Sequence, residues 1–334
     1  MGELTLGIVI VLVLVLAAEF VNGATDAPNA IATVVSTRVL SPRSAIVMAT
    51  VFNSLGVISG TAVAVTIGKG FVQHDAMTLS AIGAAMVAIV LWSSLAWHYG
   101  LPTSETHALV ASLTGAGYAV GGMDALVWSG WEKVLIGLLF STFLGFGGGY
   151  AILLAIYRIF HRATPRRVEL VFGKLQIGSA AFMAFSHGSN DGQKFMGVFT
   201  LALMVGGLLP VGGAFSIPWW VMVVCAITMA VGTAAGGWRI IKTMGMQMTK
   251  LRPYQGFAAE TGAAVAIELA SRLGIPVSTT HTISTSIMGV GAARKFSAVR
   301  WGVVGEVVAA WILTFPICAV IGWLVATAVQ KLSV

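Results

Sequence analysis

Oxygen-bearing side chains gather in one short segment near the N-terminus, which reads Asn22-Gly-Ala-Thr25-Asp26-Ala-Pro28-Asn29. Its carboxylate, amide and hydroxyl oxygens are hard ligands of the kind that Na⁺ and other hard cations prefer. Pro28 disfavours helical geometry in the residue before it, so we expect an interrupted helix whose freed backbone carbonyls act as further ligands. The alternative is a polar helix end just outside an apolar segment. We predict that this segment binds or couples a cation through Asn22, Thr25, Asp26 and Asn29.

A second segment, His-Gly-Ser-Asn190-Asp191-Gly-Gln-Lys194, offers the same kinds of oxygen atoms. It differs in one physical respect, because Lys194 stands where the first segment has Asn29. A fixed ammonium group can occupy the place of a bound cation, or it can pair with Asp191. The alternative is a lysine that extends its ammonium group to the membrane surface. We predict a cation-binding or coupling role for Asn190, Asp191 and Lys194.

Two further segments share a pattern, since Gly100-Leu-Pro-Thr-Ser-Glu-Thr-His107 and Gly274-Ile-Pro-Val-Ser-Thr-Thr-His281 are identical at five of eight positions. Pro followed by Ser and Thr is typical of a helix N-terminus with hydroxyl caps. Two such N-termini facing each other would offer backbone N–H groups, hydroxyl donors and the positive ends of two helix dipoles to one oxyanion. Ordinary Ser and Thr packing between membrane helices is the alternative, and two matched copies favour the anion site.

Three ionisable residues in these segments, Glu105, His107 and His281, are candidate proton carriers. Histidine titrates near neutral pH, and an acid in apolar surroundings has to line a cavity, form a pair or bind a proton. A neutral histidine that donates to a backbone carbonyl is the competing explanation for His107 and His281.

The four segments form two pairs that occur in the same order along the chain, which indicates an internal repeat. We expect a first transmembrane repeat over residues 1–160, a basic central loop over residues 161–174 and a second transmembrane repeat over residues 175–334. Matching apolar segments interrupted by Gly and Pro are typical of secondary transporters, in which discontinuous helices meet at the midplane of the bilayer.

The composition excludes a water-soluble protein. Of the 334 residues, 57% are apolar and only 9% are charged, whereas a soluble domain carries about 25% charged residues. A membrane span takes about 20 apolar residues, so there is room for about 10–12 membrane helices, including two broken or re-entrant hairpins. The fold class we predict is an all-α polytopic membrane protein with two homologous, inverted halves.

The excess of basic residues also fits a membrane protein. The net charge of +7 could indicate nucleic acid, but the Lys and Arg residues lie between apolar stretches, as expected of cytoplasmic loops. We therefore expect lipid rather than nucleic acid as the surrounding partner. A membrane-embedded enzyme and an anion channel are the competing classes, and the chain contains neither a His-Glu-x-x-His nor a Gly-x-Ser-x-Gly motif.

The paired segments resemble the signature of the inorganic phosphate transporter family, a Gly-Ala-Asn-Asp-Val-Ala-Asn-Ala-like stretch in each half. Here the two copies read Gly-Ala-Thr25-Asp26-Ala-Pro-Asn29-Ala and Gly-Ser-Asn-Asp191-Gly-Gln-Lys194. The resemblance implies inorganic phosphate as substrate, an inverted-repeat fold, a homodimer and a multi-pass location in a bacterial or archaeal plasma membrane. It also implies that the phosphate is contacted by Thr103, Ser104, Thr106, Gln193, Ser278, Thr279 and Thr280.

The chain departs from that signature at Thr25 and Lys194. Its Gly-Gln-Lys form resembles the bacterial low-affinity branch, which is associated with proton coupling and with neutral metal–phosphate complexes. The resemblance therefore leaves open whether Na⁺ or H⁺ is the coupling cation and whether a divalent metal accompanies phosphate. Some relatives carry sulfate, so a sulfate symporter of the same fold is an alternative. No resident cofactor or metal is expected beyond the transported cation.

Two aspartates near the bilayer midplane would repel a phosphate dianion. At 4 Å and an effective dielectric constant of about 20, each pair of unit charges costs about 4 kcal/mol. One hydroxyl hydrogen bond contributes only about 1 kcal/mol. We therefore expect phosphate to bind well only after Na⁺ or H⁺ has offset the charges of Asp26 and Asp191, which makes coupling obligatory.

Overall fold

The computed structural model describes residues 5–70, 72–73, 77–210 and 215–332, which are helical apart from connections and one isolated bridge between Val72 and Leu126. The helices of the first half are α1 (Leu6–Ser36), α2 (Pro42–Val57), α3 (Ala62–Lys69), α4 (Leu79–Tyr99), α5 (Glu105–Gly121), η2 (Met123–Ala125) and α6 (Trp128–Ile159). Those of the second half are α7 (Pro165–Val205), α8 (Trp219–Ala235), α9 (Trp238–Lys242), the π-helical turn η3 (Thr243–Gln247), α10 (Pro253–Arg272), α11 (Thr279–Arg294), η4 (Phe296–Ala298) and α12 (Trp301–Leu332).

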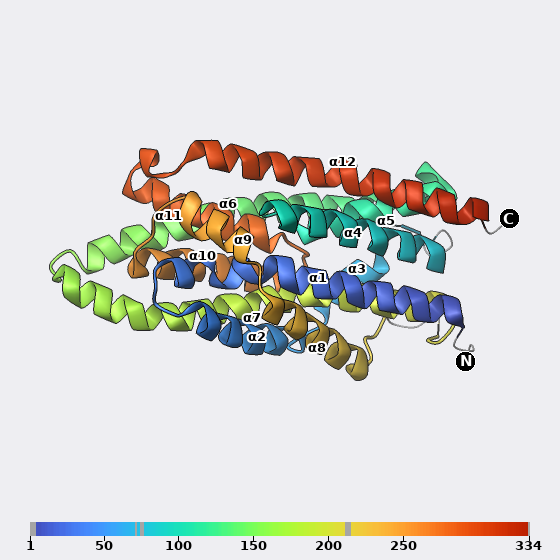
Figure 1. Ribbon diagram of the computed structural model, residues 1–334, viewed down its shortest axis with the longest axis horizontal. Coiled ribbons are helices and arrows are strands. Elements are labelled where there is room, and N and C mark those ends of the chain that lie inside the picture. The colour runs from blue at the N-terminus through green and yellow to red at the C-terminus, as the bar shows by residue number, and fades with distance from the viewer. Residues whose placement is uncertain (1–4, 71, 74–76, 211–214, 333–334) are drawn as a thin grey trace.

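The same series of elements occurs twice, with opposite direction. A long helix (α1, α7) is followed by a bent pair (α2–α3, α8–α9), a hairpin (α4–α5, α10–α11) and a second long helix (α6, α12). The angle between the two segments of a bent pair is 66° for α2 and α3, and 65° for α8 and the segment that continues from α9 into η3. Both termini lie at one end of the bundle and the α6–α7 turn at the other, so α7 runs against α1 (Figure 1). This arrangement is the one expected of inverted halves.

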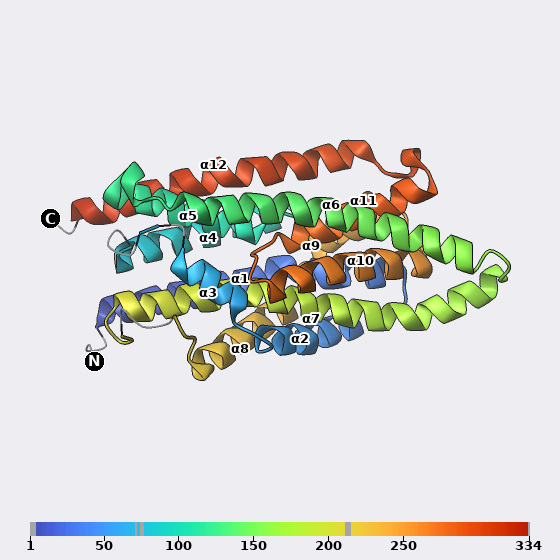
Figure 2. The ribbon, with the colours of Figure 1, turned by 180° about the vertical axis from the view of Figure 1, so that it is seen from behind.

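The two hairpins enter the bundle from opposite ends. Hairpin α4–α5 lies in the half of the molecule that holds the termini, and hairpin α10–α11 lies in the other half, as the reverse view also shows (Figure 2). Their tips meet near the middle, where the Thr106 hydroxyl donates to the Val277 carbonyl at 2.8 Å. The convergence of two helix N-termini expected from the paired motifs is therefore present.

Within the described residues, five helices are long and apolar enough to cross a membrane, namely α1, α4, α6, α7 and α12. The number of spans rises to as many as seven if each bent pair counts as one. Large apolar side chains also cover the outside of the bundle. Among them, Leu139 and Phe143 on α6 and Ile312 and Leu324 on α12 are exposed. Exposing this apolar surface to water would be unfavourable, whereas in a bilayer it contacts the apolar lipid chains. The all-α membrane fold is confirmed.

Glycines allow the hairpins to pack closely on helices of the opposite half. A Cβ added at Gly115 on α5 would lie 2.0 Å from the Ala319 carbonyl oxygen on α12, and one at Gly145 on α6 would lie 2.4 Å from the Thr282 carbonyl oxygen on α11. Small residues at such contacts let membrane helices approach backbone to backbone. Each hairpin is thus attached to the long helix of the other repeat.

The expected break at Pro28 is wrong, because α1 continues through it from Leu6 to Ser36. The proline ring is accommodated by Gly237, at which an added Cβ would lie 2.7 Å from Pro28 Cγ and 2.9 Å from the Ala24 carbonyl oxygen. Neighbouring helices often compensate a proline in this way inside membranes. The Ala24 carbonyl, which has no N–H partner at Pro28, is covered by the α8–α9 connection, and α1 does not unwind.

The basic loop expected over residues 161–174 is shorter than predicted. Helix α6 ends at Ile159 and α7 begins at Pro165, so only residues 160–164 connect them. Proline is favoured at the first position of a helix, where its missing N–H has no partner to lose. The remaining basic residues of this stretch belong to the first turns of α7.

Candidate functional site

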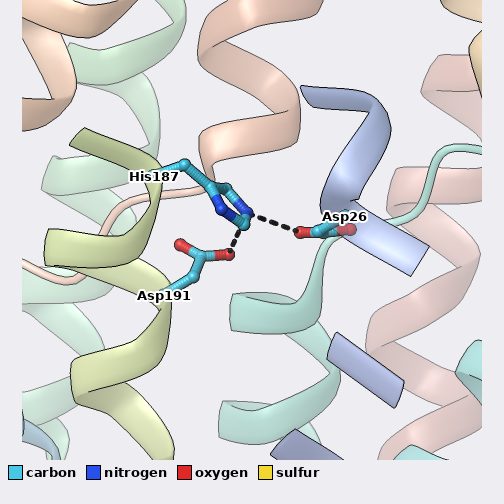
Figure 3. A group of neighbouring side chains, drawn as sticks. All are labelled: Asp26, His187 and Asp191. Carbon is cyan, nitrogen blue, oxygen red and sulfur yellow. Dashed lines mark ion pairs between the residues drawn. The ribbon is translucent and has the colours of Figure 1, made fainter. Parts of the chain in front are cut away.

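Asp26 on α1 and His187 and Asp191 on α7 meet in the middle of the bundle (Figure 3). His187 Nε2 lies 3.9 Å from Asp26 Oδ2 and 3.7 Å from Asp191 Oδ2, and all three side chains are buried. His187 and Asp191 are four residues apart on one helix and therefore share a face. This cluster is the centre of the candidate site.

The His187 ring is oriented by a chain of hydrogen bonds. Asn53 Nδ2 donates to Thr233 Oγ1 at 3.1 Å, which turns the Asn53 carbonyl oxygen toward His187. That oxygen accepts only, so His187 Nδ1, at 3.0 Å, carries the hydrogen. Nε2 then faces the two carboxylates and has no hydrogen-bond partner among the described residues.

A ring nitrogen between two carboxylates is a position for a positive charge. One ligand atom from each of Asp26, His187 and Asp191 lies within 4.8 Å of the others. A proton on Nε2 would balance the arrangement, and so would a metal ion. A set of one imidazole and two carboxylates suits a divalent transition metal better than Na⁺, which prefers oxygen ligands alone.

The tip of hairpin α10–α11 is hydrogen-bonded to the same aspartates. The Thr279 hydroxyl donates to Asp191 Oδ2 at 3.0 Å, and the Thr280 hydroxyl donates to Asp26 Oδ2 at 3.4 Å. Asn29 Nδ2 donates to both threonine oxygens, at 3.3 and 2.9 Å. A cation at the aspartates would compete for the carboxylate oxygens and release both hydroxyl donors.

Lys194 is wholly buried, with an exposed fraction of 0%, so the expectation that it could extend to the membrane surface is wrong. Its Nζ donates to Asp191 Oδ1 at 2.6 Å, to Thr106 Oγ1 at 2.6 Å and to the Val277 carbonyl at 2.8 Å. One ammonium group therefore connects α7 with the tips of both hairpins.

The two hairpin serines have matching roles. The Ser104 side chain accepts from the His107 backbone N–H at 3.3 Å, and the Ser278 side chain accepts from the His281 backbone N–H at 3.2 Å. Both serines are thus helix N-caps, as the sequence predicts. Both serines and the neighbouring Thr103 are buried.

Gln193 contacts the start of helix α3. Its Oε1 accepts from the Val63 backbone N–H at 3.0 Å, and its side chain lines a separate cavity of about 310 Å³ together with Ser189, Glu268 and Arg272. The phosphate contact that the resemblance implies for Gln193 stays a prediction.

Asn190 holds hairpin α10–α11 in place. Its Nδ2 donates to Ser271 Oγ at 3.0 Å and to the Ile275 carbonyl at 3.2 Å, while its Oδ1 accepts from the Val277 backbone N–H at 3.2 Å. With both ends of its amide engaged in this way, Asn190 positions the tip that carries Thr279 and Thr280.

Asn22 and Thr25 turn toward two other acids. Asn22 Nδ2 donates to Glu19 Oε2, and the Thr25 hydroxyl contacts Glu105 Oε1, each at 3.2 Å. Glu19 Oε1, Asn22 Oδ1 and Glu105 Oε2 have no hydrogen-bond partner among the described residues. These side chains form a second acidic group beside the centre.

The two hairpin histidines lie together behind the tips. The ring centroids of His107 and His281 are 4.6 Å apart, and His107 Nδ1 lies 3.3 Å from the Trp311 carbonyl. His107 stacks on Phe315 and His281 on Trp311, both on α12. The carbonyl contact of His107 is the one expected of a neutral histidine.

Several side chains of this network were not identified as site residues from the sequence, among them Glu19, Asn53, His187 and Glu260. His187 could have been recognised by its four-residue spacing from Asp191. Glu260 on α10 is buried and accepts from the Thr33 hydroxyl at 2.5 Å, from Gln176 Nε2 at 3.0 Å and from the Ser179 hydroxyl. Its partners come from α1 and α7, and only the fold brings them together.

Comparisons with known proteins place the chain among transporters. The model of the phosphate transporter family matches residues 22–322. A protein of Rhizobium meliloti (strain 1021) named "Probable low-affinity inorganic phosphate transporter" is 44% identical, with 91% of this chain and 90% of that protein covered. A protein of Bacillus subtilis (strain 168) with the same name is 39% identical, with 94% of each chain covered.

The fold matches a solved structure titled "The sodium-dependent phosphate transporter" with a TM-score of 0.92, covering 99% of this chain and all of that one at 24% sequence identity. At this identity the match supports the fold alone. Since the family and the named relatives are transporters, the expectation that the chain is not an enzyme is confirmed. The family model and the two relatives together show that this chain is an integral membrane protein of the phosphate transporter family.

Proposed function

We propose that the chain is a symporter that moves inorganic phosphate together with a cation by alternating access. The observation that carries this proposal is the contact between Thr106 and Val277, which brings two helix N-termini together beside Asp26 and Asp191. Helix N-termini and hydroxyl groups are donors suited to an oxyanion. The aspartates beside them make the site unfavourable for that anion until a positive charge arrives.

In this proposal the phosphate contacts come from Thr103, Ser104, Thr106, Ser278, Thr279 and Thr280. Cation binding frees the hydroxyls of Thr279 and Thr280 from the aspartates, and the anion then takes both donors. A cation-free site keeps these donors engaged and holds two carboxylates next to the anion position. Binding is therefore ordered, with the cation first.

We propose a proton as the coupling cation ahead of Na⁺, because His187 Nε2 faces both carboxylates. The donor set also suits a divalent metal that accompanies phosphate as a neutral complex. A sulfate symporter of the same fold is the second candidate for the anion.

The basic residues support an orientation in the membrane. Those at the α1–α2 connection, the α6–α7 turn and the α11–α12 connection, including Arg38, Arg162, Arg167, Arg294 and Arg300, lie toward the end opposite the termini (Figure 1). By the positive-inside rule this end faces the cytoplasm. We propose a bacterial or archaeal plasma membrane and, from the family resemblance, a homodimer, which mass measurement in lipid nanodiscs would test.

Uptake of radiolabelled phosphate into proteoliposomes tests the proposal. An inward proton or Na⁺ gradient is imposed, with and without Mg²⁺, and sulfate is added as a competitor. We expect accumulation above the external concentration that collapses when the driving gradient is dissipated. Flux that only equilibrates phosphate would indicate a channel, and stronger inhibition by sulfate than by unlabelled phosphate would identify sulfate as the substrate.

A further inference from the structure

The internal repeat places two chemically different residues at equivalent positions. Asn29 follows Asp26 by three residues, and Lys194 follows Asp191 by three residues. Asn29 is neutral and donates to the hairpin hydroxyls of Thr279 and Thr280. Its counterpart carries a charge into the same buried centre, so the two halves contribute unequal charge to one site.

The contacts of Lys194 Nζ match those of an ammonium group. The Val277 carbonyl and the Asp191 carboxylate can only accept. The Thr106 hydroxyl gives its own hydrogen to the Val277 carbonyl, so toward Lys194 it also accepts. Three acceptors require three N–H donors, and a neutral amine has two.

The oxygen atoms around Nζ form the kind of ligand set that a hard metal cation uses. They are one carboxylate, one hydroxyl and one backbone carbonyl, at 2.6, 2.6 and 2.8 Å. Full burial of Lys194 removes water as a further partner. The ammonium group is therefore held in a compact oxygen site and offsets one of the two central aspartates in every state that keeps these contacts.

We propose that Lys194 is a built-in cation that takes the place of one transported cation. Its charge offsets Asp191, and a single mobile positive charge at the Asp26, His187 and Asp191 cluster then completes the neutralisation of both aspartates. This inference rests on the proposed function. Its consequence is that each phosphate is accompanied by one cation fewer than in a site with asparagine at position 194.

Lys194→Asn tests the inference, because it gives both halves the same residue. The number of cations moved per phosphate is measured in proteoliposomes from the gradient at which net phosphate flux is zero, with the membrane potential clamped at zero. We expect the variant to couple one cation more than the parent. At a tenfold cation gradient its limiting phosphate accumulation should therefore be about tenfold higher.

A matched control accompanies the measurement. Lys174→Asn makes the same chemical change at an exposed position of the same helix, and it should leave the stoichiometry unchanged. An unchanged stoichiometry in Lys194→Asn would overturn the inference, whereas a parent protein that accumulates no phosphate would overturn the proposed function.

If Lys194→Asn does not transport, phosphate binding to the purified protein gives the same information. The dissociation constant for phosphate is measured as a function of cation concentration, and the slope of its logarithm against the logarithm of cation concentration counts the cations bound with the anion. We expect that slope to steepen by one in Lys194→Asn relative to the parent and to Lys174→Asn. An equal slope in all three proteins would refute the built-in cation.

Discussion

Asp191 and Asp26 look alike in the sequence, but the structure predicts different consequences for their loss. Asp191 Oδ1 lies 2.6 Å from Lys194 Nζ with both groups buried, whereas Asp26 has no lysine or arginine partner among the described residues. Asp191→Asn would leave the ammonium group buried without its counter-charge. Removing one partner of a buried ion pair costs about 3–5 kcal/mol of stability. Asp26→Asn loses a weak hydrogen bond from Thr280, which is worth about 1 kcal/mol or less.

The assay is the free energy of unfolding in mixed detergent micelles, compared among the parent and the two variants. We expect Asp191→Asn to be less stable than Asp26→Asn by at least about 2 kcal/mol, the difference between these two costs. The double variant Asp191→Asn with Lys194→Gln removes both charges and should regain most of the loss. Equal stability of the two single variants, or no recovery in the double variant, would show that the Lys194 pair is not formed as described.

Other parts of the site make equally specific predictions. Gly188→Val should prevent assembly, because a Cβ there would lie 2.1 Å from the Asn53 carbonyl oxygen, and size-exclusion chromatography would show loss of the monodisperse peak. Ser104→Ala combined with Ser278→Ala should lower phosphate affinity while each lost cap costs about 1 kcal/mol of stability; unchanged affinity in binding measurements would place the anion elsewhere. His187→Gln should reduce proton-driven uptake while phosphate exchange at equal pH persists, and equal loss of both activities would contradict a coupling role.

Local chemistry explains what could be predicted from the sequence. The caps Ser104 and Ser278 depend on a hydroxyl three residues before the N–H that it accepts from, so a short motif is enough to identify them. The pairing of the hairpins followed from the repeat of that motif. The membrane fold followed from composition, because a bilayer leaves few alternatives to helices.

The expectations that were wrong depend on contacts between residues far apart in the sequence. Pro28 does not break α1 because Gly237, far along the chain, packs against it. The amide of Asn190 positions a hairpin, and Gln193 lines a side cavity, although both lie within two residues of Asp191 in the sequence. Neighbouring residues on a helix point in different directions. The motif alone therefore did not predict which of its side chains reach the cluster of Asp26, His187 and Asp191.

The close glycine contacts of the hairpins have a mechanical consequence. Hairpin α4–α5 packs closely on α12 at Gly115 of α5, and hairpin α10–α11 packs closely on α6 at Gly145 of α6. Each hairpin is therefore expected to move together with a long helix of the other half: α4–α5 with α12, and α10–α11 with α6. A protein cut at the α6–α7 turn would need both fragments present to assemble either tip. Displacement of one tip would also be transmitted to the other half without a dedicated linker.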